Sequence, residues 1–258
     1  MELKIKQEGE FNFVEQGEGE VLVLLHGLFG ALSNFNDVIE RFSKRCKVVI
    51  PIMPIYTMPM LDLGVKGLAI FVNKFIEYKR YDKVTLLGNS LGGHVALVYM
   101  KNYPQKVKAM VLTGSSGLYE NAMGGTYPKR GDFDYIKEKV AYTFYDPANA
   151  TDELVSEVFE VTNNRLKVIR ILALAKSAIR YNMRDDIKNF NIPVCLIWGK
   201  QDKVTPPEVA EEFHEVLPDS ELHWIDLCGH APMMERPVEF NIILDGFLDR
   251  IFGPAKES

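Results

Sequence analysis

A serine stands between two glycines in the stretch Gly88-Asn89-Ser90-Leu91-Gly92. An apolar run of β type precedes this motif, and an apolar stretch of helical pattern follows it. A strand that turns into a helix within a few residues strains the serine backbone and leaves no room for β-carbons beside it. The hydroxyl then lies at a helix N-terminus, where N–H groups favour developing negative charge. The motif therefore predicts a nucleophilic serine at Ser90.

A phosphate-binding loop is the competing interpretation, because Gly88 and Gly93 have the glycine spacing of that motif. Such a loop continues with Lys and then Ser or Thr, which bind the phosphates and magnesium. Here His94 and Val95 follow instead. The sequence therefore excludes the phosphate-binding loop.

A serine hydroxyl needs a base to remove its proton, and an acid holds that base in one tautomer. His230 lies in a loop between Gly229 and Pro232, just beyond the last strand expected. Ligands of open α/β sheets bind at this edge, outside the carboxyl ends of the strands. His230 is therefore the predicted base.

The other four histidines fit other positions. His214 is expected on the surface of a polar helix, and His223 is expected inside a strand. His94 is expected to pack one helical turn beyond Ser90, and His26 precedes a glycine at the end of a strand.

Asp202 is the predicted acid, because it comes directly after an expected strand that ends near Gly199. The spacing of 28 residues from position 202 to position 230 leaves room for a helix and a strand, which brings both residues to one edge. Asp226 is a rival, although it lies only four residues before His230, at the end of a strand. The order Ser90, Asp202, His230 is the one that accompanies this serine motif.

Continuous apolar runs predict strands that are buried on both faces of a parallel sheet. These runs are 21–25, 46–50, 84–89, 107–113 and 192–198, and shorter strands are expected at 2–7, 11–15 and 221–226. Segments of helical periodicity separate most of them, including a long amphipathic helix over 62–80 and a last one over 237–252. The fold class is therefore α/β, with a mostly parallel central sheet of about eight strands and helices on both faces.

The alternation of strand and helix stops after the sixth strand. Residues 118–186 are helical in pattern and rich in aromatic side chains, which predicts a helical lid over the carboxyl edge of the sheet. Residues 1–117 and 187–258 then form the core domain. Phe29, Tyr119 and Met123 are candidates for the substrate pocket beneath the lid.

With these motifs the chain resembles the α/β-hydrolase family over nearly all of its length, in the branch of capped serine esterases and carbon–carbon hydrolases. His26-Gly27-Leu28-Phe29 is similar to the family's His-Gly-x oxyanion loop. The resemblance implies that His26 and Gly27 support this loop, while the N–H of Leu28, or alternatively Phe29, binds the oxyanion together with the N–H of Leu91. Residues 51–59 lack the Asp-x-x-Gly-x-Gly pattern of many members, which affects the shape of the pocket.

The resemblance implies a serine hydrolase, and the favoured function is a carboxylic-ester hydrolase that acts on a small, largely apolar substrate through an acyl-enzyme. One alternative is hydrolysis of a carbon–carbon bond in a diketone-type acid. Arginines of the lid could bind the carboxylate of such a substrate. These arginines are expected to be solvated helix charges instead: Arg130, Arg165, Arg170 and Arg180. A perhydrolase or haloperoxidase side activity is a further alternative. A different class of function is a ligand-binding receptor built on a hydrolase fold.

The composition limits the partners. A net charge of −5 over 258 residues and scattered lysines and arginines argue against nucleic acid and anionic membranes. No apolar run is long enough to span a membrane, the first residues do not resemble a signal peptide, and three separated cysteines indicate reduced thiols. We therefore expect a cytoplasmic protein with a small-molecule substrate, no cofactor and no metal ion; the sequence indicates no oligomeric state.

Overall fold

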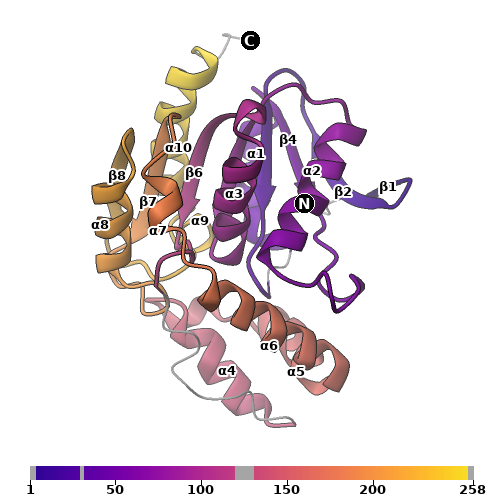
Figure 1. Cartoon of the computed structure of the whole chain (residues 1–258). Helices are drawn as coiled ribbons and strands as arrows, with labels where there is room; N and C mark the ends of the chain where they lie inside the picture. The colour runs from indigo at the N-terminus through magenta and orange to yellow at the C-terminus, as the bar shows by residue number, and fades with distance from the viewer. Residues whose placement is uncertain (1–3, 30–31, 120–130, 255–258) are drawn as a thin grey trace.

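The computed structural model describes residues 4–29, 32–119 and 131–254 (Figure 1). Within these residues, eight strands form one sheet in the order β1-β2-β4-β3-β5-β6-β7-β8. Their bounds are β1 Lys6–Glu8, β2 Phe11–Gln16, β3 Val21–Leu25, β4 Lys47–Pro51, β5 Val84–Asn89, β6 Val107–Thr113, β7 Val194–Gly199 and β8 Ser220–Ile225. The pairs from β4 to β8 are parallel, whereas β1 and β2 pair antiparallel with each other and β2 with β4. The predicted fold class is confirmed.

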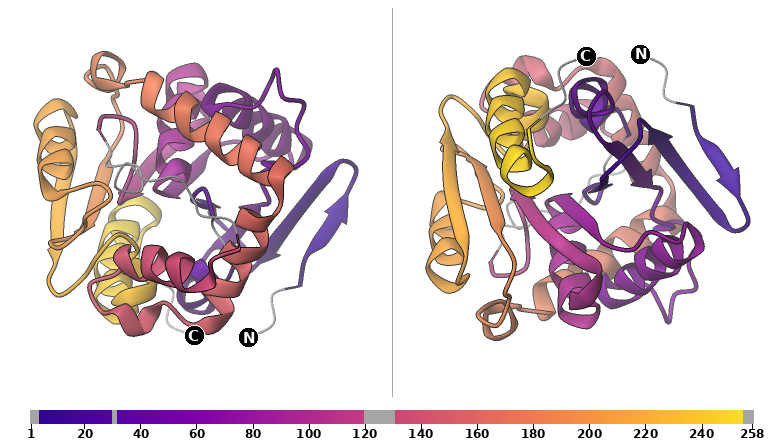
Figure 2. Two further views of the ribbon diagram at one scale, coloured as in Figure 1. Left: turned by 90° about the horizontal axis from the view of Figure 1, so that it is seen from below. Right: turned by 90° about the horizontal axis from the view of Figure 1, so that it is seen from above.

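The central strands are buried because both faces of the sheet are covered. Helices α2 (Val65–Tyr78), α3 (Leu91–Asn102) and α8 (Pro207–Val216) contribute to the hydrophobic core on one face. Helices α1 (Asn36–Phe42), α9 (Pro232–Glu235) and α10 (Pro237–Phe252) contribute to the core on the other face. Figure 2 shows the two groups on opposite sides of the sheet.

Several elements differ from the sequence prediction. The helix expected over 62–80, for example, is the shorter α2. The first strand begins at Lys6, since Lys4 and Ile5 of the expected strand 2–7 lie outside the pairing with β2. The short helix α9 was not predicted; it begins at Pro232, whose fixed backbone suits the first turn of a helix.

In the described part of the segment between β6 and β7, the α-helices are α4 Phe133–Tyr142, α5 Asp152–Asn163, α6 Arg165–Arg180 and α7 Arg184–Ile187. The side chains of Asp132, Thr151 and Asn164 cap α4, α5 and α6 respectively, because each accepts a hydrogen bond from a backbone N–H of the first turn. Figure 1 shows α4, α5 and α6 together at one end of the molecule, and the left panel of Figure 2 shows them in an arc around that end. We call α4–α6 the inserted helices. Among the described helices, none combines the length and apolar character needed to cross a membrane.

Candidate active site

Ser90 lies at the turn between β5 and α3, with φ 55° and ψ −120°. Neighbouring backbone explains the two glycines of the motif. A β-carbon on Gly92 would lie 1.9 Å from the carbonyl oxygen of Leu25, and one on Gly88 would lie 2.5 Å from that of Gly92. The N–H of Ser90 donates to the carbonyl of Thr113 at 3.1 Å, which ties the turn to the end of β6. The expected strand, strained serine and helix are therefore present.

Asp202 follows β7, and His230 follows β8. His230 Nδ1 lies 2.9 Å from Asp202 Oδ2, and both side chains are buried. The other carboxylate oxygen, Oδ1, accepts the backbone N–H groups of Val204 at 2.8 Å and Thr205 at 3.0 Å. The aspartate is thus held as a multiple acceptor beside the imidazole, as expected of an acid that orients a base.

Thr205 and Asn89 support this pair, and neither residue was predicted from the sequence. Thr205 Oγ1 donates to Asp202 Oδ2 at 2.8 Å and lies 3.3 Å from His230 Nδ1. Asn89 Nδ2 donates to the carbonyl oxygens of Thr113 at 3.0 Å and His230 at 3.2 Å, so the strand before Ser90 also holds the histidine loop. An aspartate three residues before a threonine is a turn signal that could have identified Thr205; no local signal marks Asn89.

Glu235 joins the histidine loop to the inserted helices. This buried residue of α9 accepts the N–H of Gly229 at 2.6 Å and the N–H of Asp146 at 2.7 Å. In addition, the N–H of His230 donates to the carbonyl of Thr143 at 2.8 Å. The position of His230 therefore depends on the segment that follows α4.

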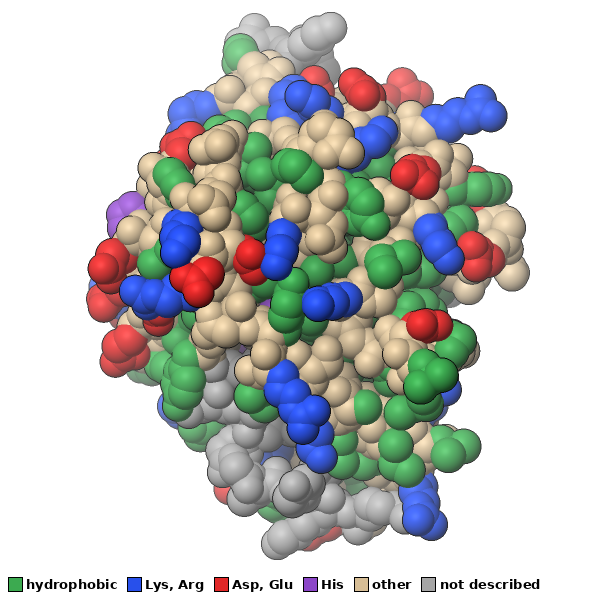
Figure 3. All heavy atoms as spheres, in the orientation of Figure 1, with side chains coloured by type: hydrophobic (Ala, Val, Ile, Leu, Met, Phe, Trp, Pro, Cys, Tyr) green, Lys and Arg blue, Asp and Glu red, His purple; other side chains and the backbone are tan. Residues whose placement is uncertain are grey.

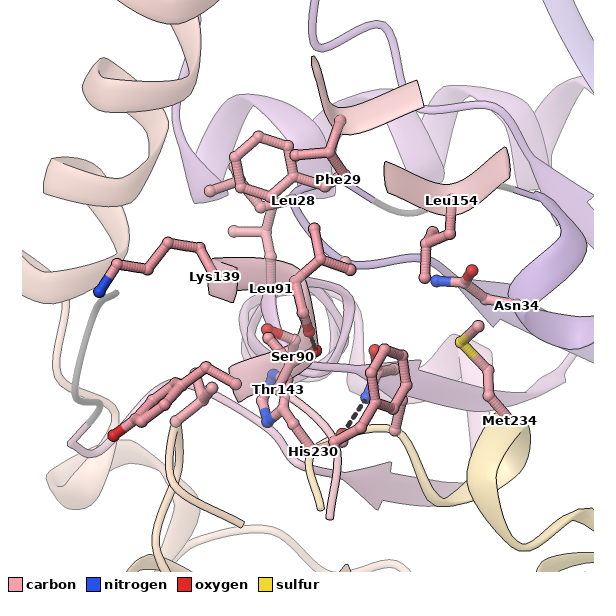
Figure 4. Close-up of a pocket in the computed structure, with 18 of the residues that line it drawn as sticks. Leu28, Phe29, Asn34, Ser90, Leu91, Lys139, Thr143, Leu154, His230 and Met234 are labelled. Carbon is pink, nitrogen blue, oxygen red and sulfur yellow. Dashed lines mark hydrogen bonds between the residues drawn. The ribbon is translucent and has the colours of Figure 1, made fainter. Parts of the chain in front are cut away.

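Ser90 and His230 both line a cavity of about 220 Å³, and Figure 4 shows their side chains next to each other. The inserted helices contribute a large part of its wall, and most of the described lining side chains are apolar. Those from the inserted helices and from the turn after α4 include Ile136, Val140, Phe144, Leu154, Val158, Ala175 and Ala178. Lys139 also lines the cavity, but Figure 4 shows its amino group pointing away from Ser90.

The segment from His26 to Leu28 lies at the same cavity, which Gly27, Leu28 and Leu91 all line. His26 Nδ1 lies 2.9 Å from the carbonyl oxygen of Gly27, and its Nε2 accepts the N–H of Met53 at 3.3 Å. Because Nε2 accepts, Nδ1 must carry the proton and donate. Burial lowers the pKa of His26, which favours this neutral form. His26 therefore connects the loop to the segment after β4.

Two backbone N–H groups beside Ser90 are available to bind a substrate oxygen. In the described part of the chain, the N–H groups of Leu28 and Leu91 make no hydrogen bond to another residue. Leu91 is the first residue of α3, so its N–H has no partner within the helix. Two such donors next to a serine can bind an oxyanion.

The remaining candidates lie in several places. Phe29 lines the cavity, whereas Tyr119 is 57% exposed and is not among its described lining residues. Met123 lies outside the described residues. Asp226 is exposed and accepts a hydrogen bond from Gln201, away from His230.

Besides His26, three further histidines are not among the described residues that line the cavity. His94 is buried with its ring stacked on Tyr181, and burial lowers the pKa of His94 to about 4. His214 is exposed and bonds Ser220 at 2.9 Å, and His223 lies on β8.

One group of described side chains could hold a metal ion, away from the cavity. Ligand atoms of Cys195, Glu221 and His223 all lie within 4.8 Å of one another on β7 and β8. Arg250 Nη2 already pairs with Glu221 at 2.5 Å, which places a positive charge beside this group. None of the three lines the cavity with Ser90.

Known proteins share this architecture. The model of the alpha/beta hydrolase fold family matches residues 20–166. MGS-MChE2, an alpha/beta hydrolase enzyme from a sediment metagenome of the Mar Chica lagoon, is 45% identical with a TM-score of 0.80, over 96% of this chain and 98% of that one.

Two curated relatives differ in the chemistry that their names give. Monoacylglycerol lipase ABHD6 of Mus musculus is 26% identical, over 90% of this chain and 76% of the relative. The 2-hydroxy-6-oxo-2,4-heptadienoate hydrolase of Pseudomonas putida is 24% identical, over 93% of this chain and 92% of the relative. Family match, fold and relatives agree: the chain is a hydrolase of the alpha/beta hydrolase fold family.

Proposed function

We propose that this protein is a carboxylic-ester hydrolase whose nucleophile is Ser90, with His230 as the base and Asp202 as the orienting acid. The inserted helices act as a lid over the substrate, which is a small and largely apolar ester. The observation that carries this proposal is the cavity, in which a serine and a histidine meet a wall of apolar side chains.

In the first step, Ser90 Oγ bonds to the ester carbonyl carbon while its proton passes to His230. Because Nδ1 faces Asp202, the proton goes to Nε2. The carbonyl becomes an oxyanion that the N–H groups of Leu28 and Leu91 bind; one such donor is typically worth about 10²–10³ in rate. The ester C–O bond then breaks, and His230 gives its proton to the leaving alcohol.

In the second step, a water molecule gives a proton to His230 and bonds to the acyl carbon. The bond to Ser90 breaks, Oγ regains its proton from His230, and the carboxylic acid leaves. These steps need no metal ion or cofactor, because the residues of this chain supply the nucleophile, the base and the oxyanion donors.

Carbon–carbon hydrolysis is the second candidate, since several relatives are named as hydrolases of 2-hydroxy-6-oxo-dienoates. Such a substrate carries a carboxylate, which calls for a cation in the pocket. Arg165 and Arg180 are exposed, and Arg170 Nη1 donates to the carbonyl oxygen of Met58 at 2.5 Å. None of these three arginines is among the described residues that line the cavity, and Arg130 lies outside the described residues. Lys139 is a cation in the described wall, but its amino group points away from Ser90 (Figure 4). The described wall therefore favours the ester.

The first experiment is labelling with a fluorophosphonate probe, together with turnover of p-nitrophenyl esters of increasing acyl length. Wild type should label, and Ser90→Ala should lose the label and about 10⁴-fold or more in kcat/KM. Ser116→Ala is the matched control, because Ser116 also lines the cavity but bonds to the backbone of Ser90. This control should keep the label.

The acyl-length series and a second substrate separate the two candidates. An ester hydrolase with this cavity should prefer a short to medium apolar acyl chain over acetate. Faster turnover of 2-hydroxy-6-oxo-6-phenylhexa-2,4-dienoate than of any ester would instead establish the carbon–carbon reaction. A wild type that takes no label and turns over neither substrate would contradict the proposal and favour a ligand-binding role.

A further inference from the structure

We propose that the outer face of α6, with the adjoining loop, docks the protein onto an anionic lipid surface. The α6 face consists of Leu166, Ile169, Lys176 and Arg180 on the helix and Met60 and Leu61 on the loop. Docking at this face does not require that Ser90 react, so it stands apart from the proposed hydrolysis.

The α6 face exposes large apolar side chains that the core does not use. Leu166 is 72% exposed and Ile169 is 46% exposed. The inward stripe of the same helix consists of Ile171, Leu174 and Ala178, which are buried. The exposed residues are thus on a different side of the helix, where burial against a partner would remove apolar surface from water.

The loop after β4 adds to the same surface. Leu61 is fully exposed and Met60 is 45% exposed. This loop lies along α6, because Arg170 Nη1 donates to the carbonyl oxygen of Met58 and Lys167 Nζ lies 5.3 Å from the ring centre of Tyr56. Further along, the N–H of Val65 donates to Ser177 Oγ at 3.2 Å. The loop that carries Met60 and Leu61 therefore lies beside α6.

The charge of α6 is opposite to that of the whole chain, so the expectation from net charge that anionic membranes are not partners does not hold for this face. The helix carries five basic residues and no acidic one, whereas the chain has a net charge of −5. Leu166, Ile169, Lys176 and Arg180 follow one line along the helix at helical spacing, apolar in the first half and basic in the second. Figure 3 shows hydrophobic side chains gathered over the inserted helices at the lower right, with Lys and Arg side chains among them.

An anionic lipid surface fits this combination better than other partners. Its headgroups attract Lys and Arg, and its acyl region accepts apolar side chains that nucleic acid would leave in water. A second copy of the chain would bring two basic helices together. The acids of α5, such as Glu157 and Glu160, are exposed and would be repelled, which limits docking to α6 and the loop. The inner side of α6 lines the cavity through Ala175 and Ala178, so lipid would lie beside the cavity wall.

The test is sedimentation with vesicles of phosphatidylcholine, with and without phosphatidylglycerol. Ser90→Ala protein is used, so that turnover cannot change the lipid. It should bind the anionic vesicles at least about 10-fold more tightly than the neutral ones, since each cation near an anionic surface contributes about fivefold. Added salt should weaken this binding.

Two double variants in this background locate the contact. Leu166→Ser with Ile169→Ser removes the apolar part, and Lys176→Glu with Arg180→Glu reverses the basic part; each should weaken binding about 10-fold or more. Matched controls carry equal changes elsewhere: Val238→Ser with Ile242→Ser on α10, where both side chains are exposed, and Lys44→Glu with Lys83→Glu. The controls should bind as the parent does.

The same double substitutions are also made in protein that retains Ser90. These variants should hydrolyse water-soluble p-nitrophenyl acetate at the wild-type rate, which shows that they fold. Equal binding to both vesicle types would overturn the docking proposal. It would also be overturned if the α10 control variant lost as much vesicle binding as the α6 variants. A change of oligomeric state in the α6 variants alone would assign the face to a second copy and overturn it as well. Vesicle binding without ester turnover would uphold docking and contradict only the hydrolase proposal.

Discussion

Ser90 adopts a backbone conformation that residues with a side chain rarely occupy. Its φ of 55° with ψ of −120° costs about 1–3 kcal/mol for a non-glycine residue. The surrounding backbone enforces this conformation, since β3 and α3 approach each other too closely at Gly92 for any side chain. The strain is retained at the expense of stability, at a position where Ser90 lies next to His230 in the cavity (Figure 4).

Replacement of Ser90 by glycine should therefore stabilise the fold relative to replacement by alanine. Alanine keeps the strain, whereas glycine adopts this conformation without it, which leaves a net gain of about 1 kcal/mol after the extra entropy of the unfolded chain. Urea unfolding of Ser90→Gly and Ser90→Ala measures the difference directly, and both variants should be inactive. Equal free energies of unfolding would mean that the turn is unstrained.

Thr205 is the residue whose loss should affect the proposed chemistry without touching the substrate. Its hydroxyl donates to Asp202 Oδ2, and it is not among the described residues that line the cavity. Thr205→Val leaves that oxygen with one donor fewer, so kcat should fall about tenfold with KM unchanged. Thr205→Ser keeps the hydroxyl and should keep most of kcat. If both variants lose kcat equally while their melting temperatures hold, the hydroxyl has no positioning role.

At the scale of elements, α9 connects the histidine loop to the inserted helices. One carboxylate, Glu235, satisfies backbone N–H groups from two segments that are far apart in sequence, at Gly229 and Asp146. Each buried N–H left without an acceptor costs about 1–3 kcal/mol. A displacement of the inserted helices would therefore also displace His230.

Glu235→Ala should lower the free energy of unfolding by about 3 kcal/mol and also lower kcat, because both N–H groups lose their acceptor. Glu235→Gln keeps one accepting oxygen, so its free energy of unfolding and its kcat should lie between those of wild type and Glu235→Ala. Chemical denaturation and ester kinetics measure the effects, with Glu239→Ala as the control, since Glu239 is exposed on α10. An alanine variant with wild-type kcat would show that the histidine loop holds its position alone.

Parallel strands and their carboxyl ends were predictable because each depends on local sequence. A strand buried on both faces is a continuous apolar run in the sequence. Ser90 and Asp202 each follow such a run, and His230 follows the neighbouring strand β8. Helix α4 shows the limit. Its apolar positions fit helical periodicity, but no periodicity tells whether Ile136 and Val140 face a cavity or a packed core. That distinction depends on the distance between the inserted helices and the sheet.

Contacts across the chain escaped prediction for the same reason. Asn89 and Glu235 bind backbone groups of distant segments, and only the folded chain brings those groups within reach. Tyr119 was expected at the pocket from its aromatic character alone, yet its position just after β6 leaves it exposed. Aromatic composition indicates burial on average but does not give direction.

For the whole molecule, buried histidines set the response to mild acid. Burial lowers the pKa of His94 to about 4 and also lowers that of His26. An unfolded chain binds these protons near pH 6.5, so between about pH 4 and 6.5 it holds more protons than the folded chain. Stability should consequently fall as pH falls through this window and reach a plateau above about pH 7.

Paired carboxylates act in a lower range. Burial alone would raise the pKa of Asp245, but hydrogen bonds from Arg41 and Arg45 lower it overall. A lowered carboxylate pKa contributes stability that is present above the unfolded value and is lost only as pH falls below about 4. The loss between pH 7 and 5 therefore belongs to histidine rather than to these ion pairs.

His94→Phe should flatten the dependence of stability on pH, because the ring that stacks on Tyr181 is kept while the titrating nitrogen atoms are removed. For wild type, the free energy of unfolding should drop by about 2 kcal/mol from His94 alone between pH 7 and 5, and this part should vanish in the variant. Urea unfolding at several pH values in this range compares the two slopes. Equal slopes in wild type and His94→Phe would show that the buried ring accepts its proton as readily as an exposed one, and would assign the acid sensitivity to His26.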